Sequence, residues 1–442
     1  MKSITKAWVC AQIGAREHYA IPRVLHQAGK LQTLFTDFWA GSLLRGSAQL
    51  VPLGPLRSLG TRWHEDLDKA EVISWNCHTL VEELRLKAES RKQKIGNQTL
   101  ASKYQKFIEI GENFAIAVRE ELKQRRDLTP NQIFFGYDTG SLETMQYLKG
   151  QGVPCVVGQM DPNRVEADLV RAEEKLWPGW SQQAVSVPVP DAYFKRREQE
   201  WIVAERVVVN SEFSKRALIQ QGVPLEKLVV IPLCYEAGGR GAKGGSRRTE
   251  DGGRNAHLRA PTSHLHPLRV LFLGQVILRK GIQYLIEAAK LLHDEPVRFD
   301  VVGAIGILAD AVKSAPSNMT FHGRATRDET ARWYEQSDVF VLPTISDGFA
   351  ITQIEAMAHG LPVIATPNCG DVVTDGMDGF IVPVADGRSL AKMIHRYVSE
   401  PELLPAQRQA AIQKSKQFTL DKLAERLLSL ENELSGGSRP SL

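Results

Sequence analysis

The sequence predicts an α/β protein with two parallel-sheet domains that face each other across a cleft. Its 442 residues exceed one average domain, so two domains are expected. In both halves, short apolar runs rich in Val, Ile and Phe alternate with helical patterns. Strands that alternate with helices form a parallel sheet with helices on both faces. A segment rich in Gly and Arg lies between the halves and predicts a linker or surface insertion.

The first half contains strand candidates and one long, charged helical stretch. The strand candidates lie at 5–12, 31–37, 132–136, 154–160, 205–210 and 227–232. The helical stretch extends from about Leu80 to Leu128. Residues 39–70 show no clear period, and no element is predicted for them.

The second half is more regular. Its strand candidates lie at 269–274, 297–303, 319–323, 338–343, 361–366 and 379–383. The clearest helical pattern follows the first of these strands, because Ile282, Leu285, Ile286 and Ala289 share one helical face. The tail from Leu404 to Leu434 also has an amphipathic helical period.

These patterns divide the chain into four segments. Residues 1–236 are expected to form an N-terminal domain, and 237–267 the linker or insertion. Residues 268–400 are expected to form the C-terminal, ligand-binding domain. Residues 401–442 are expected to form a helix that packs back toward the N-terminal domain and ends in a frayed tail.

Composition excludes several classes of protein. Hydrophobic residues make up 43% and charged residues 24%, which excludes a mostly disordered chain, a collagen and a coiled-coil rod. The five cysteines are far apart and form no CxxC pair, so a disulfide framework or zinc knuckle is not expected. The N-terminal apolar run is too short for a signal peptide, and no later run is long enough for a membrane span. We expect a cytoplasmic protein.

The net charge of +4 is concentrated in one place. Segment 237–267 carries six Lys or Arg residues against two acidic ones, which accounts for the whole excess. The rest of the chain is neutral on balance, so no nucleic-acid partner is expected. A solvated linker is the favoured interpretation of the segment. Peripheral contact with an anionic membrane at its inner face stays open as an alternative.

The first motif with chemical meaning is RVLFLGQVILRKGIQYLIEAA at 269–289. It predicts a strand, a short loop and a helix that starts near Gly281, with Arg279 and Lys280 at the N-terminus of that helix. Free backbone N–H groups and the helix dipole favour an anion there. Two adjacent cations are unfavourable at that end of a helix unless an anion is bound, and they suit a diphosphate. Solvation of an ordinary loop is the alternative.

The second motif is DVFVLPTISDGFAITQIEAMAHGLPVIAT at 338–366. It predicts a buried strand, a loop with Asp347, Gly348 and Phe349, a helix, and another strand. Asp347 and Glu355 are eight residues apart, and carboxylates accept hydrogen bonds from sugar and ribose hydroxyls. A charge at Glu355, on an otherwise apolar helix, is costly unless it has a partner. An exposed Glu on an amphipathic helix is the alternative.

These two motifs resemble the donor-binding half of glycosyltransferase family 4 (group 1), whose members are retaining enzymes of the GT-B fold with two Rossmann-like domains. The family pattern joins a G-R, K-G block to E-G-F-G and E-A-M-A-x-G-x-P-V-I-A, and this chain has DGFAITQIEAMAHGLPVIAT. Further support comes from the stretches at 13–37, 204–232 and 368–383, which resemble other parts of the family.

The resemblance implies roles for particular residues. Lys280, assisted by Arg279, would neutralise the diphosphate of the donor as it leaves. Asp347 would contact hydroxyls of the donor sugar, and Glu355 would bind the ribose. Gly14, in the N-terminal loop, would let that loop approach the donor closely. The backbone of Gly348, Phe349 and Ala350 would lie against the sugar and the phosphates. Gly323 and Arg324 would lie near the base of the nucleotide.

Three positions depart from the family pattern. Asp347 replaces a Glu and shortens its reach by one methylene. Ala350 replaces a Gly, and its methyl group limits how closely the donor can approach the backbone. Gln275 stands where the family has Arg, so one phosphate cation is missing unless Arg279 supplies it. These departures predict either a subfamily with another donor or weak activity.

The resemblance implies a hexosyltransferase that moves a sugar from a nucleotide-diphosphate donor to a hydroxyl of a glycan, a lipid-linked sugar or a small molecule, as in polysaccharide biosynthesis. We expect no metal and no cofactor, because Lys and Arg can replace Mg²⁺ at the diphosphate. Asp161, after the strand at 154–160, is a candidate for contacting the reacting sugar or the acceptor. A structural Asp-Pro turn is the alternative for Asp161.

Rival functions remain open. A dinucleotide-dependent oxidoreductase is not supported, because the chain has no G-x-G-x-x-G after a strand. A nucleotide-sugar epimerase of the same fold would act without an acceptor. A non-enzymatic protein that binds a nucleotide-sugar is the third candidate, and the three departures from the family pattern keep it open.

Overall fold

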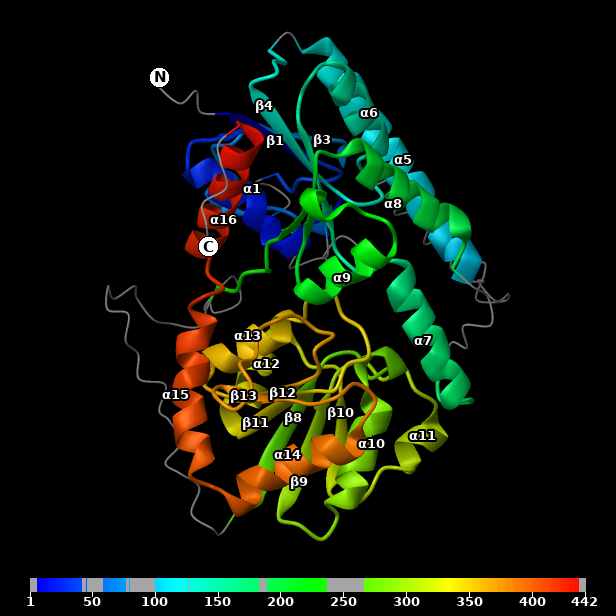
Figure 1. The fold of residues 1–442 in the computed structure, drawn as a ribbon, viewed down its shortest axis with the longest axis vertical. Coiled ribbons are helices and arrows are strands. Elements are labelled where there is room, and N and C mark those ends of the chain that lie inside the picture. Colours follow the sequence, from blue (N-terminus) through cyan, green and yellow to red (C-terminus); the bar gives the residue numbers. More distant parts are fainter. Residues whose placement is uncertain are drawn as a thin grey trace.

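The computed structural model describes residues 6–41, 45, 59–76, 79, 100–125, 127–182, 189–236 and 266–436. Two parallel sheets, each with helices on both faces, lie one above the other in Figure 1. The predicted α/β architecture with two parallel-sheet domains is therefore confirmed. Most of segment 237–267 and residues 80–99 of the predicted helical stretch lie outside the described residues.

The first sheet has seven strands in the order β3-β2-β1-β4-β5-β6-β7, all paired in parallel. Its strands are β1 (Ala7–Gln12), β2 (Leu31–Thr36), β3 (Val72–Ser74), β4 (Gln132–Tyr137), β5 (Cys155–Gln159), β6 (Arg206–Val209) and β7 (Leu228–Val230). The six predicted strands are confirmed, and β3 was missed. This edge strand is too short to show a period of two.

The helices of the first half are α1 (Ala20–Gln27), α5 (Leu100–Gln124), α6 (Leu142–Gly150), α7 (Arg164–Leu176), α8 (Asp191–Val203) and α9 (Glu212–Gln220). All of them except α7 pack around the first sheet, on both of its faces (Figure 1). Successive residues of a strand point to opposite faces. Trp8 and Cys10 of β1 therefore pack in the cluster that includes α1, while Val9 and Ala11 pack with α5 and α6.

The second sheet has six parallel strands in the order β10-β9-β8-β11-β12-β13. They are β8 (Leu268–Leu273), β9 (Val297–Val302), β10 (Met319–Gly323), β11 (Val339–Leu342), β12 (Val363–Ala365) and β13 (Gly379–Ile381). The helices that follow in this part are α10 (Ile282–Leu291), α11 (Ala309–Lys313), α12 (Arg327–Gln336), α13 (Ile351–Ala358) and α14 (Gly387–Ser399). All predicted strands of this half are confirmed.

The C-terminal tail forms two helices, where the sequence predicted one continuous pattern. The first, α15 (Leu403–Ser415), places Ala411 in the core beside α13, and the second, α16 (Leu420–Leu434), packs against α1. Thr419 caps α16 by accepting a hydrogen bond from the backbone N–H of Lys422. In Figure 1 the chain consequently returns along the lower sheet to the upper one.

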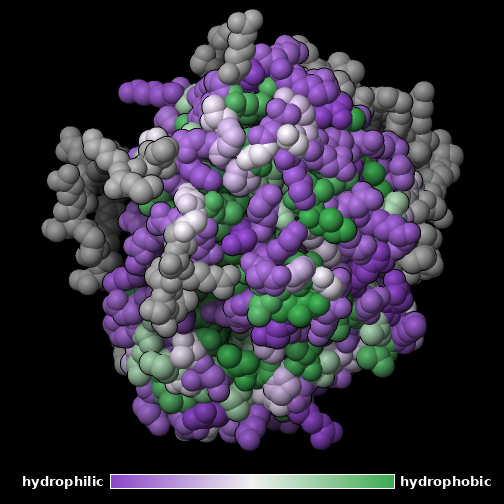
Figure 2. Space-filling view, turned by 45° about the horizontal axis from the view of Figure 1, so that its top comes forward, coloured by the Kyte–Doolittle hydropathy of each residue, from purple (hydrophilic) through white to green (hydrophobic). Residues whose placement is uncertain are grey.

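Figure 2 shows that hydrophilic residues dominate this face of the molecule, with apolar residues in smaller patches between them. In the part of the chain that the structure describes, no helix has the length and apolar character needed to cross a membrane.

Candidate active site

The two basic residues after β8 precede the helix in a separate turn, whereas the sequence predicted them at the N-terminus of the helix itself. Arg279 and Lys280 belong to a 3-10 turn, Leu278–Lys280, and α10 begins only at Ile282. Gly281 joins the two with φ +75°, and a Cβ at this position would collide with the backbone carbonyl of Pro343, just after β11. Glycine therefore lets the turn pack directly against the end of the neighbouring strand.

The loop after β11 is bound to this turn through backbone and side chains. The carbonyl of Arg279 accepts hydrogen bonds from the backbone N–H of Ile345 at 2.9 Å and from the Thr344 hydroxyl at 3.0 Å. Lys280 Nζ forms an ion pair with Asp347. Arg279 Nη1 lies 3.8 Å from Asp347 Oδ1. The structure thus brings together three of the predicted site residues.

Glu355 has the partner that its place on an apolar helix requires. The Tyr334 hydroxyl, from α12, donates a hydrogen bond to Glu355 Oε2 at 2.9 Å. Burial and the charge of Glu355 raise the pKa of Tyr334 well above its usual value, so Tyr334 stays a donor. His359 stacks on Tyr334 with ring centroids 5.2 Å apart. One oxygen of the predicted ribose-binding carboxylate is therefore oriented by α12.

The residues after Asp347 connect the two halves of the molecule. A Cβ on Gly348 would collide with the backbone carbonyl of Met160, which follows β5 in the first half. The side chain of Phe349 points instead into the core of the second half, where it packs against Phe418. Ala350 N–H donates to the Cys369 carbonyl at 2.9 Å. At Gly348, therefore, the second half packs directly against the backbone of the first half.

Asp161 lies in a buried charged cluster at the carboxyl edge of the first sheet. Arg197, 1% exposed, forms ion pairs with Asp138 and, at 2.8 Å, with Asp161. Burial works to raise the pKa of Asp161, but the charge of Arg197 and its hydrogen bond hold that pKa below the usual value. Asp161 Oδ1 also accepts from the Asn163 backbone N–H at 2.8 Å. Asp161 therefore forms the predicted alternative, a structural turn, and also stays ionised at this edge of the first sheet.

Glu166 is a site residue that the sequence analysis missed. It lies in the first turn of α7, and its Oε2 accepts hydrogen bonds from Arg279 Nη1 at 3.3 Å and from the Ser346 hydroxyl at 3.0 Å. Burial and the charges of Asp161 and Asp347 raise the pKa of Glu166 to about 6, although Arg279 opposes the shift. No local pattern singles out Glu166, because α7 has the composition of a charged surface helix.

The other predicted residues lie at or just after strand ends. Gly14 follows β1 with φ +72°, and its N–H donates to Asp37 Oδ1 at 2.7 Å. Gly323 ends β10, where its carbonyl accepts from Gly303 N–H at 2.7 Å. Arg324 and Gln275 are exposed. Carboxyl ends of parallel strands share one edge of a sheet, so Gly14 and Asp161 lie on the same edge.

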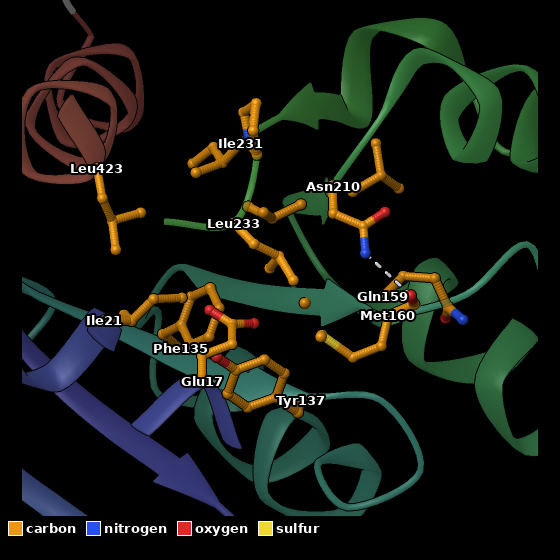
Figure 3. A pocket seen from close by; sticks show the side chains of 14 residues that line it. Glu17, Ile21, Phe135, Tyr137, Gln159, Met160, Asn210, Ile231, Leu233 and Leu423 are labelled. Atoms are coloured by element: carbon orange, nitrogen blue, oxygen red, sulfur yellow. Dashed lines mark hydrogen bonds between the residues drawn. The ribbon is translucent and has the colours of Figure 1, made fainter. Parts of the chain in front are cut away.

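A small pocket lies behind Met160, on the first-sheet side (Figure 3). Glu17 and Tyr137 lie next to each other in it, and Asn210 donates a hydrogen bond to the Met160 carbonyl at 3.0 Å. Burial raises the pKa of Glu17 to about 7, with Tyr137 and Arg16 opposing. Glu17 has a left-handed backbone, with φ +50°, so the loop after β1 is strained beside this pocket.

Comparison with known proteins identifies the class of this fold. The model of the family described as glycosyl transferases group 1 matches residues 267–400. Sucrose-phosphate synthase from Thermosynechococcus elongatus superposes with a TM-score of 0.61, 17% identity, and coverage of 98% of this chain and 100% of that one. Alr3699/HepE from Anabaena, solved in complex with UDP, has a TM-score of 0.56, 13% identity, and coverage of 97% and 100%. The chain has the GT-B fold.

Glycosyltransferases of known sequence are similar to part of this chain. D-inositol 3-phosphate glycosyltransferase from Streptomyces bingchenggensis is 28% identical over 277 residues, which are 57% of this chain and 58% of that protein. The amylovoran biosynthesis glycosyltransferase AmsK from Erwinia amylovora is 25% identical over 202 residues, or 42% and 46% of the two chains. This chain spans less than three-fifths of the length of these two relatives. Residues 267–400 form a glycosyl transferases group 1 domain.

Proposed function

We propose that the chain is a retaining glycosyltransferase that moves a hexose from a nucleotide-diphosphate sugar to an acceptor hydroxyl. The observation that carries the proposal is the contact of Lys280 and Arg279 with Asp347 inside the group 1 domain. Two cations and a carboxylate are the groups needed for a diphosphate and the sugar next to it. Solved proteins of the same fold contain UDP, which supports a nucleotide-sugar donor.

In this proposal the two cations stabilise the leaving group. The nucleotide diphosphate gains negative charge as the bond to the sugar breaks, and preorganised donors replace the water that solvates that charge. Gly281 fixes the turn that carries Lys280, so the backbone needs little rearrangement when the diphosphate takes the place of Asp347 beside Lys280. Asp347 would contact the sugar and Glu355 the ribose. No metal is needed, and turnover is expected to persist in EDTA.

The acceptor would bind on the side of the first sheet. We propose residues 1–236 as the acceptor-side domain and 268–400 as the donor-binding domain. Asp161 lies at the edge of the first sheet that faces the donor groups, where it would orient the acceptor or the reacting sugar. The acceptor would attack on the face that the diphosphate leaves, with retention of anomeric configuration. AmsK, by its name, acts in polysaccharide biosynthesis, which supports a glycan acceptor.

The test starts with a thermal-shift screen against nucleotide-sugars, because a ligand that binds the native state raises the unfolding temperature. With the donor it selects, Lys280→Ala is expected to lower kcat roughly 100-fold, the scale of losing one stabilising donor at a leaving group. Lys290→Ala, which removes an exposed lysine of α10, is the matched control and should leave kcat unchanged.

Three outcomes would contradict the proposal. Equal rates for Lys280→Ala and wild type would exclude Lys280 from the reaction. Donor conversion that needs no acceptor and gives an isomeric nucleotide-sugar would indicate the epimerase. Tight binding of the donor without turnover would indicate a binding protein.

A further inference from the structure

Helix α7 belongs to the first half by sequence but lies against the second sheet's domain in space (Figure 1). Its Glu173, only 5% exposed, accepts hydrogen bonds from Gln283 Nε2 at 2.9 Å and from the Tyr284 hydroxyl at 2.8 Å, both on α10. The Trp177 ring packs edge-on against Tyr284. A buried carboxylate with two hydrogen-bond donors is costly to separate from them. We take α7 to be firmly attached to α10.

The residues after α7 extend this attachment through the backbone. Trp180 packs against the core of the second domain, and its carbonyl accepts from Leu308 N–H at 2.7 Å. Ser181 forms an antiparallel bridge with Ile307, and Gln182 N–H donates to the Gly306 carbonyl at 3.0 Å. Backbone pairing of this kind fixes register, so segment 166–182 is integrated into the second domain along its length.

The start of α7 remains attached to the first domain. Arg164 forms ion pairs with Asp191 at 2.7 Å and Glu198 at 2.6 Å, both on α8. Asn163, just before it, has φ +58° and donates to Gln221 Oε1 at 3.0 Å. The change of attachment from one domain to the other therefore occurs between Arg164 and Glu166.

Glu166, in the first turn of α7, contacts the proposed donor-binding groups of the second domain. Arg279 Nη1 donates both to Glu166 Oε2 at 3.3 Å and to the Ser346 carbonyl at 3.1 Å, while the Ser346 hydroxyl donates to Glu166 Oε2 at 3.0 Å. These three bonds close a ring that fixes the guanidinium beside Asp347. Arg279 is the cation that would compensate for Gln275.

We propose that Glu166 is a positioning residue of the donor site: carried on α7 into the second domain, it holds the Arg279 guanidinium in place for the leaving diphosphate. This inference rests on the proposed glycosyltransferase function. A simple ion pair between domains would affect stability alone. Positioning of Arg279 affects the rate of the step in which the diphosphate leaves, because misplaced catalytic groups lose rate more than binding.

The pH dependence follows from the groups that face Glu166. These are Arg279, Asp347 from the loop after β11, Asp161 after β5, and Tyr104 from α5. Ionised Glu166 attracts Arg279, and protonated Glu166 does not. Because the pKa of Glu166 is raised to about 6 in the protein without donor, kcat/KM, which reports the groups of the free enzyme, should fall as the pH drops through 6. The hydrogen bond from Ser346 lowers this pKa, so removing it should move the acidic limb, the low-pH fall of the pH–rate profile, to higher pH.

The test measures kcat and KM from pH 5 to 8 with the donor selected by the thermal-shift screen. Glu166→Gln is expected to lower kcat roughly tenfold near neutral pH, with KM little changed and the acidic limb lost. Glu166→Asp should recover part of kcat and keep the limb. Ser346→Ala should shift the limb upward. Asp168→Asn, on the exposed side of the same helix, is the matched control and should behave as wild type.

The outcomes separate the two proposals. If wild type transfers sugar and Glu166→Gln matches Asp168→Asn in kcat and pH profile, the positioning role is wrong while the glycosyltransferase stands. An unmoved limb in Ser346→Ala also overturns the positioning role. If wild type neither binds a nucleotide diphosphate nor transfers sugar, the proposed function and this inference fail together. Should Glu166→Gln not fold, Ser346→Ala and Glu166→Asp still decide the question.

Discussion

At the scale of single residues, Lys280 and Asp347 neutralise each other in the structure. Both are donor-binding groups in the proposed reaction, so the ion pair keeps a half-buried cation and carboxylate satisfied until a donor separates them. The diphosphate would take over Lys280, and a sugar hydroxyl would take over Asp347. A Glu at position 347 would place its carboxylate one methylene farther from the backbone, so its ion pair with Lys280 would have a different geometry.

Gly281 controls where Lys280 lies, and its replacement is the first residue-scale prediction. Gly281→Ala places a Cβ against the Pro343 carbonyl at φ +75°, so it is expected to cost roughly 3 kcal/mol of the free energy of unfolding or more. Gly323→Ala is the matched control, because it has a similar φ of +71° but open space around the added Cβ. It should cost only about 1 kcal/mol.

Urea unfolding of both variants measures the difference. A loss no larger for Gly281→Ala than for Gly323→Ala would show that the turn relaxes away from β11 without cost. In that event the close packing of the turn would not be what fixes Lys280.

The residues that sequence could predict are those inside a local motif. Lys280, Asp347 and Glu355 lie in contiguous blocks whose spacing is set by one strand, one loop and one helix. Glu166 and Arg197 have no such block, because their roles depend on how α7 and α8 pack. A Glu in the first turn of a charged helix is usually a solvated residue that favours the helix dipole. Only tertiary structure distinguishes Glu166 from such a residue.

At the scale of elements, the tail was predicted as helical but its division was not. The sequence KQFT between α15 and α16 contains the cap, Thr419, but a Thr within a helical period is a weak signal. The strands were predictable because buried parallel strands are continuous apolar runs. The short edge strand β3 lacked that signature.

Helix α16 provides the element-scale prediction. Glu431, only 5% exposed, accepts hydrogen bonds from Trp8 Nε1 at 2.9 Å and from Lys30 Nζ at 2.6 Å. Glu431→Ala leaves an indole N–H and an ammonium unpaired, and is expected to cost about 2–4 kcal/mol of the free energy of unfolding. Glu425→Ala, on the exposed face of the same helix, is the control and should leave the unfolding midpoint unchanged. Equal midpoints for the two variants would mean that α16 is held by apolar contacts alone.

At the scale of the whole molecule, the two-sheet architecture followed from the alternation of strands and helices, but the crossing of α7 did not. Chain order assigns α7 to the first domain, and its contacts with Gln283 and Tyr284 involve residues more than 100 positions away. Such long-range pairing leaves no periodic trace in one sequence. The contacts between the domains are therefore the part of the site that sequence could not supply.

The contact of Gly348 with Met160 gives the whole-molecule prediction. A Cβ on Gly348 would collide with the Met160 carbonyl, and Asn210 lies beside the same point. Gly348→Ala should therefore separate the two domains slightly while each keeps its own core, which increases the radius of gyration by small-angle X-ray scattering without ligand. Proper closure is needed to exclude water from the reaction, so kcat should fall roughly tenfold or more. Gly150→Ala, at the open end of α6, is the control and should change neither quantity. If Gly348→Ala lowers kcat but leaves the radius of gyration unchanged, the loss comes from a direct contact of residue 348 with the donor. That result would contradict impaired domain closure as the cause.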